Sequence, residues 1–377
     1  YFEHHHDTLH RSIRGPRRGY RKCEYWMGTV ILYQTIMPDQ QIPLMKLLSS
    51  LLLLVTAIAL GSCFKEDEKV PPHARGEVKT DTVPLTENYR YQVWYSLDSG
   101  TLVRKEIKTN VDLGFDCRPN GAAIILNTAD FMKVIDLGEV PFGNTSDTTG
   151  LVMRFDKSDG NPDSTAIDRW YRVEGGDTVS NHHVYAVSRG LDELGNPLGL
   201  YQVIFDSLSA GKYYFRFAPL HGGTASSAVV TKDPAVNFTW FSLPLDISVT
   251  AEPPKGSYDL VFGQYTTMLY TDLGQPYPYL VTGVLLNRNG VTAAVDTIHP
   301  FLSITRETVQ SIPFSAALDR IGYDWKYYNF TTGVYTIRPG LSYIVRTVSG
   351  QYFKMRFTAF YNRNGLKGYP VIEYQAL

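Results

Sequence analysis

Apolar and polar residues alternate along much of the chain beyond residue 85. Every second residue in the stretch 353–359 is apolar (Phe, Met, Phe, Ala), and Lys, Arg and Thr lie between them. This period of two is typical of a half-buried β-strand, because successive side chains of a strand point to opposite faces. The stretches 213–217 and 343–346 follow the same period. We predict a strand at each.

Turn dipeptides separate the alternating stretches, and helical patterns are rare. Two short stretches, 129–136 and 305–311, are the helical candidates. The chain is therefore predicted to be mainly β. The turn dipeptides are Asn120-Gly121, Asp159-Gly160, Asn289-Gly290, Ser349-Gly350 and Asn364-Gly365.

A weak internal repeat divides the predicted strands into two sets. The segments 93–97 and 112–115 are echoed by 239–243 and 259–263, and a second echo links 168–171 and 184–187 with 324–327 and 343–346. Aromatic and β-branched residues recur by chance in β proteins, but two echoes in the same order favour a duplicated unit. We predict two tandem antiparallel β domains, residues 85–235 and 236–377.

A predominantly apolar run from Leu47 to Leu60 follows the pair Met45-Lys46. It is too short to cross a hydrocarbon core of ~30 Å as a helix, and it has the length of a signal-peptide core. It ends in Gly61-Ser62-Cys63, and small residues before a cysteine suit a lipoprotein signal peptidase. We predict a signal peptide at 45–62 and a lipid anchor on Cys63. A buried helix with a chance cysteine at its end is the alternative.

The residues on either side of this signal give two further expectations. Phe64-Lys65-Glu66-Asp67-Glu68 resembles the lipoprotein export signal of Bacteroidetes, which implies display on the outer face of the outer membrane, although a charged juxtamembrane tether would look similar. Residues 63–84 are predicted to be the lipidated cysteine and a tether. Because a secretory signal works at an N-terminus, we expect residues 1–44 to be over-extended translation. An unusual basic leader is the alternative.

Composition narrows the function classes. The chain is 44% hydrophobic and 13% aromatic with a net charge of −1, so it can bury a sizeable core and has no basic excess for nucleic acid. It contains no Gly-x-Ser-x-Gly, His-Glu-x-x-His or phosphate-binding glycine motif. The acidic stretch 156–164 lacks EF-hand spacing. We expect a binding protein rather than an enzyme, and we predict no metal site.

The sequence resembles the HmuY family of Bacteroidetes lipoproteins over roughly residues 85–377. The resemblance implies a β-rich fold and a haemophore-like protein, which captures haem through two axial histidines for a TonB-dependent outer-membrane receptor. The stretch after Trp325, where the founding member places one ligand, holds no His or Met, and Phe330 falls about where that ligand would lie. The segments that carry the resemblance are 112–115, 120–121, 258–262, 321–326, 335–339, 352–357 and 371–374.

Two histidines are the candidate haem ligands, because haem iron takes its axial donor from His, Met, Cys or Tyr. His299 precedes a proline, and a solvent-facing loop histidine is the alternative interpretation. His183 follows His182, and neighbouring residues of a strand point to opposite faces, so the two cannot easily share one metal. Met268 is an available thioether, whereas Met355 is expected in the core.

Four aromatic residues are candidates for lining a pocket: Trp325, Tyr327, Tyr328 and Phe330. Packing within a β-sheet is the alternative reading of this run. Cys117 is expected to be buried as a small hydrophobic residue.

Two hypotheses of function follow. The first is a surface lipoprotein that binds haem or a porphyrin in haem-iron acquisition. The second is a structural or adhesive surface lipoprotein that binds a glycan, a peptide or a protein partner without haem.

Overall fold

The computed structural model describes residues 76–143 and 148–377. The predicted signal peptide (45–62), Cys63 and residues 1–44 lie outside the described residues, as does the first part of the tether. The described chain is built from β-strands with a few short helices, which confirms the mainly β prediction. None of the helices in this part is long and apolar enough to cross a membrane.

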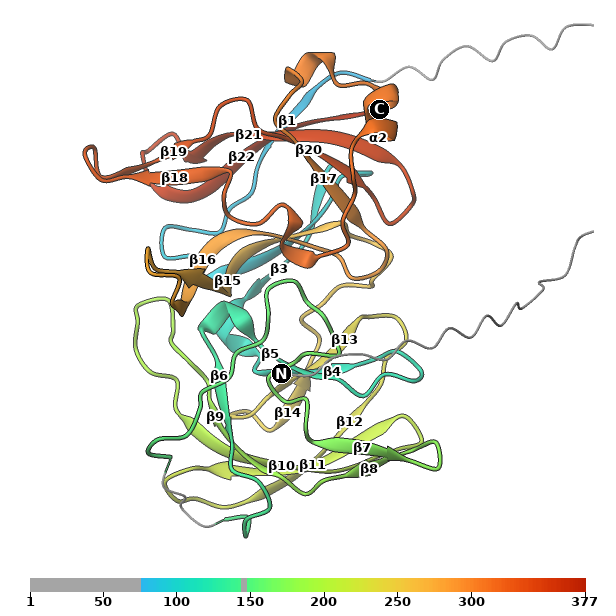
Figure 1. Cartoon of the computed structure of the whole chain (residues 1–377), viewed down its shortest axis with the longest axis vertical. Helices are drawn as coiled ribbons and strands as arrows, with labels where there is room; N and C mark the ends of the chain where they lie inside the picture. Colours follow the sequence, from blue (N-terminus) through green and yellow to red (C-terminus); the bar gives the residue numbers. More distant parts are fainter. Residues whose placement is uncertain (1–75, 144–147) are drawn as a thin grey trace, which may run out of the picture. The chain divides into compact units, whose positions relative to one another are not determined.

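The strands follow one another along the chain with few helical interruptions (Figure 1). In chain order they are β1 (Lys79–Thr82), β2 (Tyr91–Ser96), β3 (Thr101–Ile107), β4 (Leu113–Asp116), β5 (Ile124–Leu126), β6 (Lys133–Asp136), β7 (Tyr171–Glu174), β8 (Asp177–Ser180), β9 (Val184–Ser188), β10 (Leu200–Ser209), β11 (Lys212–Pro219), β12 (Ser226–Thr231), β13 (Phe238–Ser242), β14 (Ile247–Val249), β15 (Leu260–Tyr270), β16 (Pro276–Leu286), β17 (Thr292–Asp296), β18 (Lys326–Asn329), β19 (Val334–Ile337), β20 (Ser342–Arg346), β21 (Tyr352–Tyr361) and β22 (Lys367–Ala376). The helices are the 3-10 turns η1 (Lys108–Asn110), η2 (Thr128–Asp130), η3 (Phe301–Ser303) and η4 (Leu318–Arg320), and α2 (Arg306–Ser311).

Two larger sheets order four of their strands alike along the chain, and the edge strand that completes each is β1 in one and β12 in the other. One runs β17-β20-β21-β22-β1, and the other runs β6-β9-β10-β11-β12, with β8 and β7 attached to β10. Two four-stranded sheets, β3-β2-β15-β16 and β14-β13-β4-β5, are likewise equivalent to each other. Strands β18 and β19 form a separate two-stranded hairpin (Figure 1). The strand pairs in these sheets are antiparallel, as adjacent strands joined by short turns require.

The sheets divide the strands into two sets, β1–β3 with β15–β22 and β4–β14, and both sets cross the predicted boundary between residues 235 and 236. Strand β2 pairs with β15, and β4 pairs with β13, so each four-stranded sheet takes one hairpin from each side of that boundary. The predicted ranges 85–235 and 236–377 therefore do not match the way the strands are shared. Strand pairing joins residues by hydrogen bonds across any sequence distance, which a reading of consecutive segments cannot capture. The origin of the two sets by duplication stays a prediction.

Equivalent aspartates fix the two shared sheets. The carboxylate of Asp112 accepts a hydrogen bond from Leu243 N at 2.7 Å, and that of Asp259 accepts one from Leu97 N at 2.8 Å. Asp112 and Asp259 are both fully buried, so these carboxylates need such partners. The echo between 93–97 with 112–115 and 239–243 with 259–263 thus corresponds to one hydrogen-bond pattern used twice.

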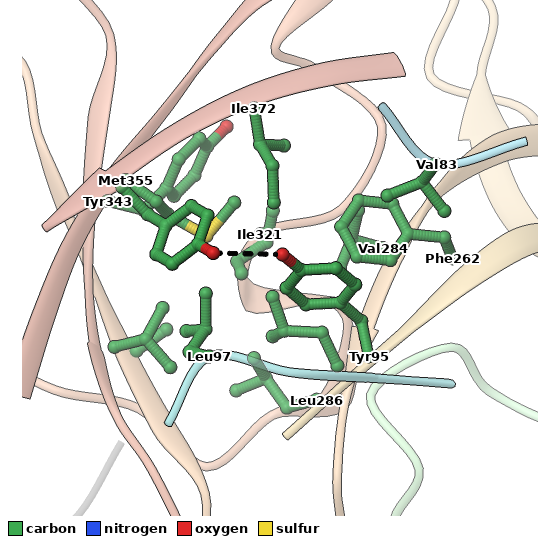
Figure 2. Packing of buried hydrophobic residues seen from close by; sticks show 14 of the residues in the cluster. Val83, Tyr95, Leu97, Phe262, Val284, Leu286, Ile321, Tyr343, Met355 and Ile372 are labelled. Atoms are coloured by element: carbon green, nitrogen blue, oxygen red, sulfur yellow. Dashed lines mark hydrogen bonds between the residues drawn. The ribbon is translucent and has the colours of Figure 1, made fainter. Parts of the chain in front are cut away.

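The apolar residues form two main cores. The first core lies between β2, β15, β16 and the β20–β22 sheet, and Figure 2 shows Tyr95, Phe262 and Met355 within it. The Tyr95 hydroxyl donates a hydrogen bond to Tyr374 Oη at 3.2 Å inside this core. The second core packs β4, β5 and β13 against the β9–β12 sheet, around Trp170.

Local predictions were right for the alternating stretches and mixed elsewhere. The stretches 213–217, 343–346 and 353–359 are strands β11, β20 and β21. The predicted helix 305–311 corresponds to α2, which Thr305 begins through a capping box.

Two predictions were wrong, one of a helix and one of the end of the tether. The predicted helix 129–136 is the short η2 followed by β6, because Phe131 takes a left-handed backbone conformation (φ 61°) that ends the helical turn. The predicted tether up to residue 84 contains β1, which pairs with β22. Val83 and Leu85 beside it are buried, so the folded part begins earlier than predicted.

Candidate functional site

Trp325 is a core residue that supports the hairpin β18–β19. Its indole is 1% exposed and stacks on Phe357, with ring centroids 3.9 Å apart and planes 9° apart. Its Nε1 donates a hydrogen bond to Gly322 O at 3.2 Å, which satisfies the buried polar atom. The alternative reading, packing rather than lining a pocket, therefore holds for this member of the predicted aromatic set.

The other three predicted aromatics lie on the surface of the same hairpin. Tyr327 and Tyr328 are 43% and 42% exposed, and Phe330 at the turn is 91% exposed. A single exposed apolar ring is common on protein surfaces, but a group of neighbouring exposed rings is typical of a binding site. The Tyr328 ring meets Phe330 and Tyr335 edge to face, at centroid distances of 5.2 Å in each case.

A second group of exposed rings comes from the hairpin β15–β16, to which Lys326 of β18 donates a hydrogen bond at Thr282 O. Tyr277 and Tyr279 on β16 are 39% and 52% exposed and make an edge contact with each other. Tyr279 lies close enough to Tyr335 to influence its ionisation. We call the five exposed rings Tyr277, Tyr279, Tyr327, Tyr328 and Phe330 the aromatic hairpin site, in which Tyr327 lies on the face of β18 opposite that of Tyr328.

Lys326 joins the two hairpins below these rings. Its ammonium donates a hydrogen bond to Thr282 O of β16 and lies over the Trp325 and Phe360 rings, at 4.2 and 4.9 Å from their centroids. The residue is 6% exposed, and no carboxylate lies within ion-pair distance of it in the described chain. Burial lowers the pKa of Lys326 to about 7, and Asp324 opposes this shift only weakly. The base of the site is therefore a buried amine close to its titration point at neutral pH.

A cavity of about 580 Å³ adjoins the start of β18. Its volume lies within the ~300–1,000 Å³ of known ligand sites. Tyr323 on its wall lies close to Tyr277 of the aromatic hairpin site, since the two phenols interact electrostatically. Arg338, which also lines the cavity, pairs with Asp324 at 2.8 Å and lies 5.9 Å from the Tyr327 ring centroid. Cationic and phenolic groups thus converge beside the hairpin.

The structure does not bring His299 and His183 together. His299 Nδ1 lies 3.0 Å from Asp296 Oδ2 at the end of β17, and His183 Nδ1 lies 3.0 Å from Asp136 Oδ1 beside β6. The two sites belong to different sheets. Each carboxylate orients its imidazole, so the opposite ring nitrogen of each could still meet a ligand. Their assignment as haem ligands stays a prediction.

Met355 and Cys117 are buried, as predicted, and Met268 is exposed. Met355 is fully buried in the first core, and Cys117 is 5% exposed with its Sγ 3.2 Å from Thr239 Oγ1. Met268 is 44% exposed, but it lies opposite Pro278 in the strand register. Alternation therefore turns it to the face opposite that of Tyr279. Across residues 76–143 and 148–377, no three His, Cys, Asp or Glu side chains gather as a metal site.

Two parts of the site were missed from the sequence. Tyr277 and Tyr279 lie in Pro276-Tyr277-Pro278-Tyr279, where tyrosines alternate with prolines, and this pattern of ring and rigid backbone was the available signal. Lys326 gave no signal, because a lysine beside a tryptophan reads as exposed until the tertiary structure buries it.

A family model and solved structures match the chain. The family model described as HmuY protein matches residues 88–374. The crystal structure of apo PinO from Porphyromonas gingivitis is 9% identical, with a TM-score of 0.27, and the match covers 80% of this chain and 98% of that chain. The apo HmuY analog of Tannerella forsythia (TFO) is 13% identical, with a TM-score of 0.23, covering 80% of this chain and 97% of that chain. No curated protein matches the chain.

Proposed function

Because the chain belongs to the HmuY family, we propose that it binds haem or a related porphyrin at the aromatic hairpin site. The observation that carries the proposal is the set of exposed rings on two adjacent hairpins, which includes the 91% exposed Phe330. A porphyrin is a flat apolar ligand, and aromatic faces are the walls that haem sites use. Tyr277 contacts Tyr279, and Tyr328 contacts Phe330 and Tyr335, yet all five rings stay at least 39% exposed.

The groups beside the rings suit the remaining parts of the ligand. Haem carries two carboxylates, and Arg338 beside the hairpin is the proposed partner of one of them, in exchange for its surface ion pair with Asp324. Phenolic oxygen is an established axial donor to haem iron. Tyr328, half-exposed and held between Phe330 and Tyr335, is the donor that this arrangement offers.

The proposed setting is a lipid-anchored protein on the outer face of the outer membrane, acting in haem-iron acquisition with a TonB-dependent receptor as partner. Its support is the Cys63 motif and the Lys-Glu-Asp run that follows it, both outside the described residues. In this proposal the protein binds and delivers its ligand and performs no catalysis.

A hemin titration of the purified protein tests the proposal. We expect a saturable Soret shift at micromolar hemin, and we expect Tyr328→Phe to move or abolish it. His299→Ala and His183→Ala are the comparison variants for Tyr328→Phe, because each removes an alternative axial donor to the haem iron. A spectrum changed by either histidine variant and not by Tyr328→Phe would transfer the ligand role to that histidine. Absence of a saturable shift in oxidised and in reduced protein would reject haem binding.

The second candidate function is adhesion to a glycan, a peptide or a protein partner without haem. It is favoured by one observation, the absence of His and Met from the residues 326–337 of the hairpin. Exposed tyrosines stack on sugars and anchor protein interfaces equally well. Loss of glycan or cell binding on Phe330→Ser, with no Soret shift in the parent protein, would select this function.

A further inference from the structure

A polar cavity of about 490 Å³ lies away from the aromatic hairpins, next to the loop 156–165. It is large enough for a small ligand. Three of its lining residues are cationic and two are acidic. The charged ones are Arg118, Lys255, Arg288, Asp116 and Asp159.

Arg288 is the central cation of this cavity. It lies 5.1 Å from the centroid of the Phe238 ring, and its Nη1 donates a hydrogen bond to Gly160 O. In the described chain no carboxylate lies within ion-pair distance of its guanidinium. The residue is half-buried, and this burial lowers its pKa. An arginine has five N–H donors, and Gly160 accepts from one of its nitrogens.

The nearby carboxylates are already committed to other donors. Asp156 accepts from Leu126 N and Ala166 N, each at 2.6 Å. Asp116 holds Arg118 through two hydrogen bonds of 2.9 and 2.6 Å to the same oxygen. Arg118 is thereby neutralised by Asp116, and Arg288 is not neutralised by direct contact.

Glu252 is the third carboxylate near Arg288. It accepts from Asn237 N at 3.1 Å, Phe238 N at 3.0 Å and the Tyr258 hydroxyl at 2.7 Å. Burial raises its pKa, and its hydrogen bonds to these donors oppose that shift.

Lys255 provides the second cation. Its carbonyl oxygen accepts from Asn287 Nδ2 at 2.7 Å and from Asn289 Nδ2 at 3.3 Å. Because these two asparagines flank Arg288 in the sequence, the bonds hold the backbone of Lys255 next to Arg288. The equivalent position in the other strand set is Lys108, whose carbonyl accepts from Asn127 Nδ2 at 2.7 Å in the same way. Lys108 has an acidic partner, whereas the ammonium of Lys255 has none within the described ranges.

We propose that this cavity binds the oxyanion of a small ligand, a carboxylate or a phosphate group, between Arg288 and Lys255. A guanidinium presents paired N–H donors that match two oxygens of such a group, and the ammonium adds a point charge. The Phe238 face and the Leu318 side chain border the same space and provide contact for an uncharged part of the ligand. The site shares no residue with the aromatic hairpin site, so it stands independently of haem binding.

Calorimetric titration of the purified protein with inorganic phosphate, and separately with citrate, tests the proposal. We expect saturable binding of at least one of them, and the arm that saturates identifies the oxyanion class. Lys255→Gln is expected to weaken this binding by about tenfold, because it removes one charge-assisted hydrogen bond. Lys212→Gln, an exposed lysine of β11, is the matched control and should leave the affinity unchanged.

Arg288→Gln should abolish the binding, but it also removes the hydrogen bond to Gly160, so its unfolding curve must be measured alongside. Lys255→Gln keeps the test decisive if that variant is unstable. Absence of saturable binding of either anion would overturn the proposal, and so would an affinity that Lys255→Gln leaves unchanged. Hemin titration of Lys255→Gln should match the parent protein, which separates this site from the proposed haem site.

Discussion

Two hairpins occupy equivalent places in the two strand sets, and they differ in chemistry. Hairpin β7–β8 follows the buried Trp170, and hairpin β18–β19 follows the buried Trp325. The first exposes an ion pair, Arg172 Nε to Glu174 Oε1 at 2.6 Å, and joins the large sheet through Val179. The second joins no larger sheet and exposes tyrosines and Phe330.

This difference separates what the fold needs from what it does not need. The buried tryptophans recur because each fills the base of a core, where a large ring excludes water and packs tightly. The exposed rings of β18–β19 do not recur in β7–β8, so the fold does not require them. The comparison therefore supports the proposal that the aromatic hairpin binds a ligand rather than stabilising the fold.

Removing the tryptophans is expected to have the largest effect, and a similar one in both cores. Trp170→Ala and Trp325→Ala should each lower the free energy of unfolding by ~3–5 kcal/mol, because each leaves a cavity in a packed core. Urea denaturation measures this change. A loss below ~1 kcal/mol for one of them would show that its core is not closed by the tryptophan.

The two buried lysines should respond in opposite directions. Lys108 is 1% exposed, donates to Ala129 O and Gln264, and lies 3.4 Å from Asp130, so Lys108→Met should destabilise the protein by ~2–3 kcal/mol. Lys326 has no acidic partner in ion-pair distance among the described residues. Lys326→Met is therefore expected to be neutral or stabilising at pH 7.

The contribution of Lys326 to the free energy of unfolding should depend on pH. The pKa of Lys326 falls to about 7 in the folded protein, below its usual 10.5, so the unfolded chain binds more protons between these values. The Lys326 contribution to stability therefore increases from pH 7 to pH 10 and is lowest below pH 7. From pH 7 to pH 9 the free energy of unfolding of the parent protein should increase more than that of Lys326→Met. Parallel curves would contradict a buried, unpaired Lys326.

The smallest effect on stability is expected at the hairpin surfaces. Phe330→Ser, and its matched control Val173→Ser on β7–β8, should each change the free energy of unfolding by less than ~0.5 kcal/mol, because both side chains are exposed (91% and 67%). Phe330→Ser should nevertheless weaken hemin binding, whereas Val173→Ser should not. Equal hemin affinities of the two variants would remove the functional distinction between the hairpins.

The alternation of apolar and polar residues was sufficient to predict strands such as β11, β20 and β21, because a half-buried strand repeats every two residues. It also predicted that Met355 is buried, and the small hydrophobic character of a free cysteine predicted the same for Cys117. The helix predicted at 129–136 failed because the left-handed backbone of Phe131 is not visible in composition. Trp325 was placed among pocket residues because a ring in a run of aromatics looks the same whether it is buried or exposed.

The sequence by itself determined that this protein is mainly β, that it resembles the HmuY family, and that Trp325 is followed by an aromatic segment. The tertiary structure decided which of those rings face solvent, and that Lys326 is buried without an acidic partner in the described chain. It also decided that β2 pairs with β15 and β4 with β13. The physical reason is range: periodicity reports the local division between core and solvent, whereas strand pairing, burial of charge and cavities depend on residues far apart in the chain.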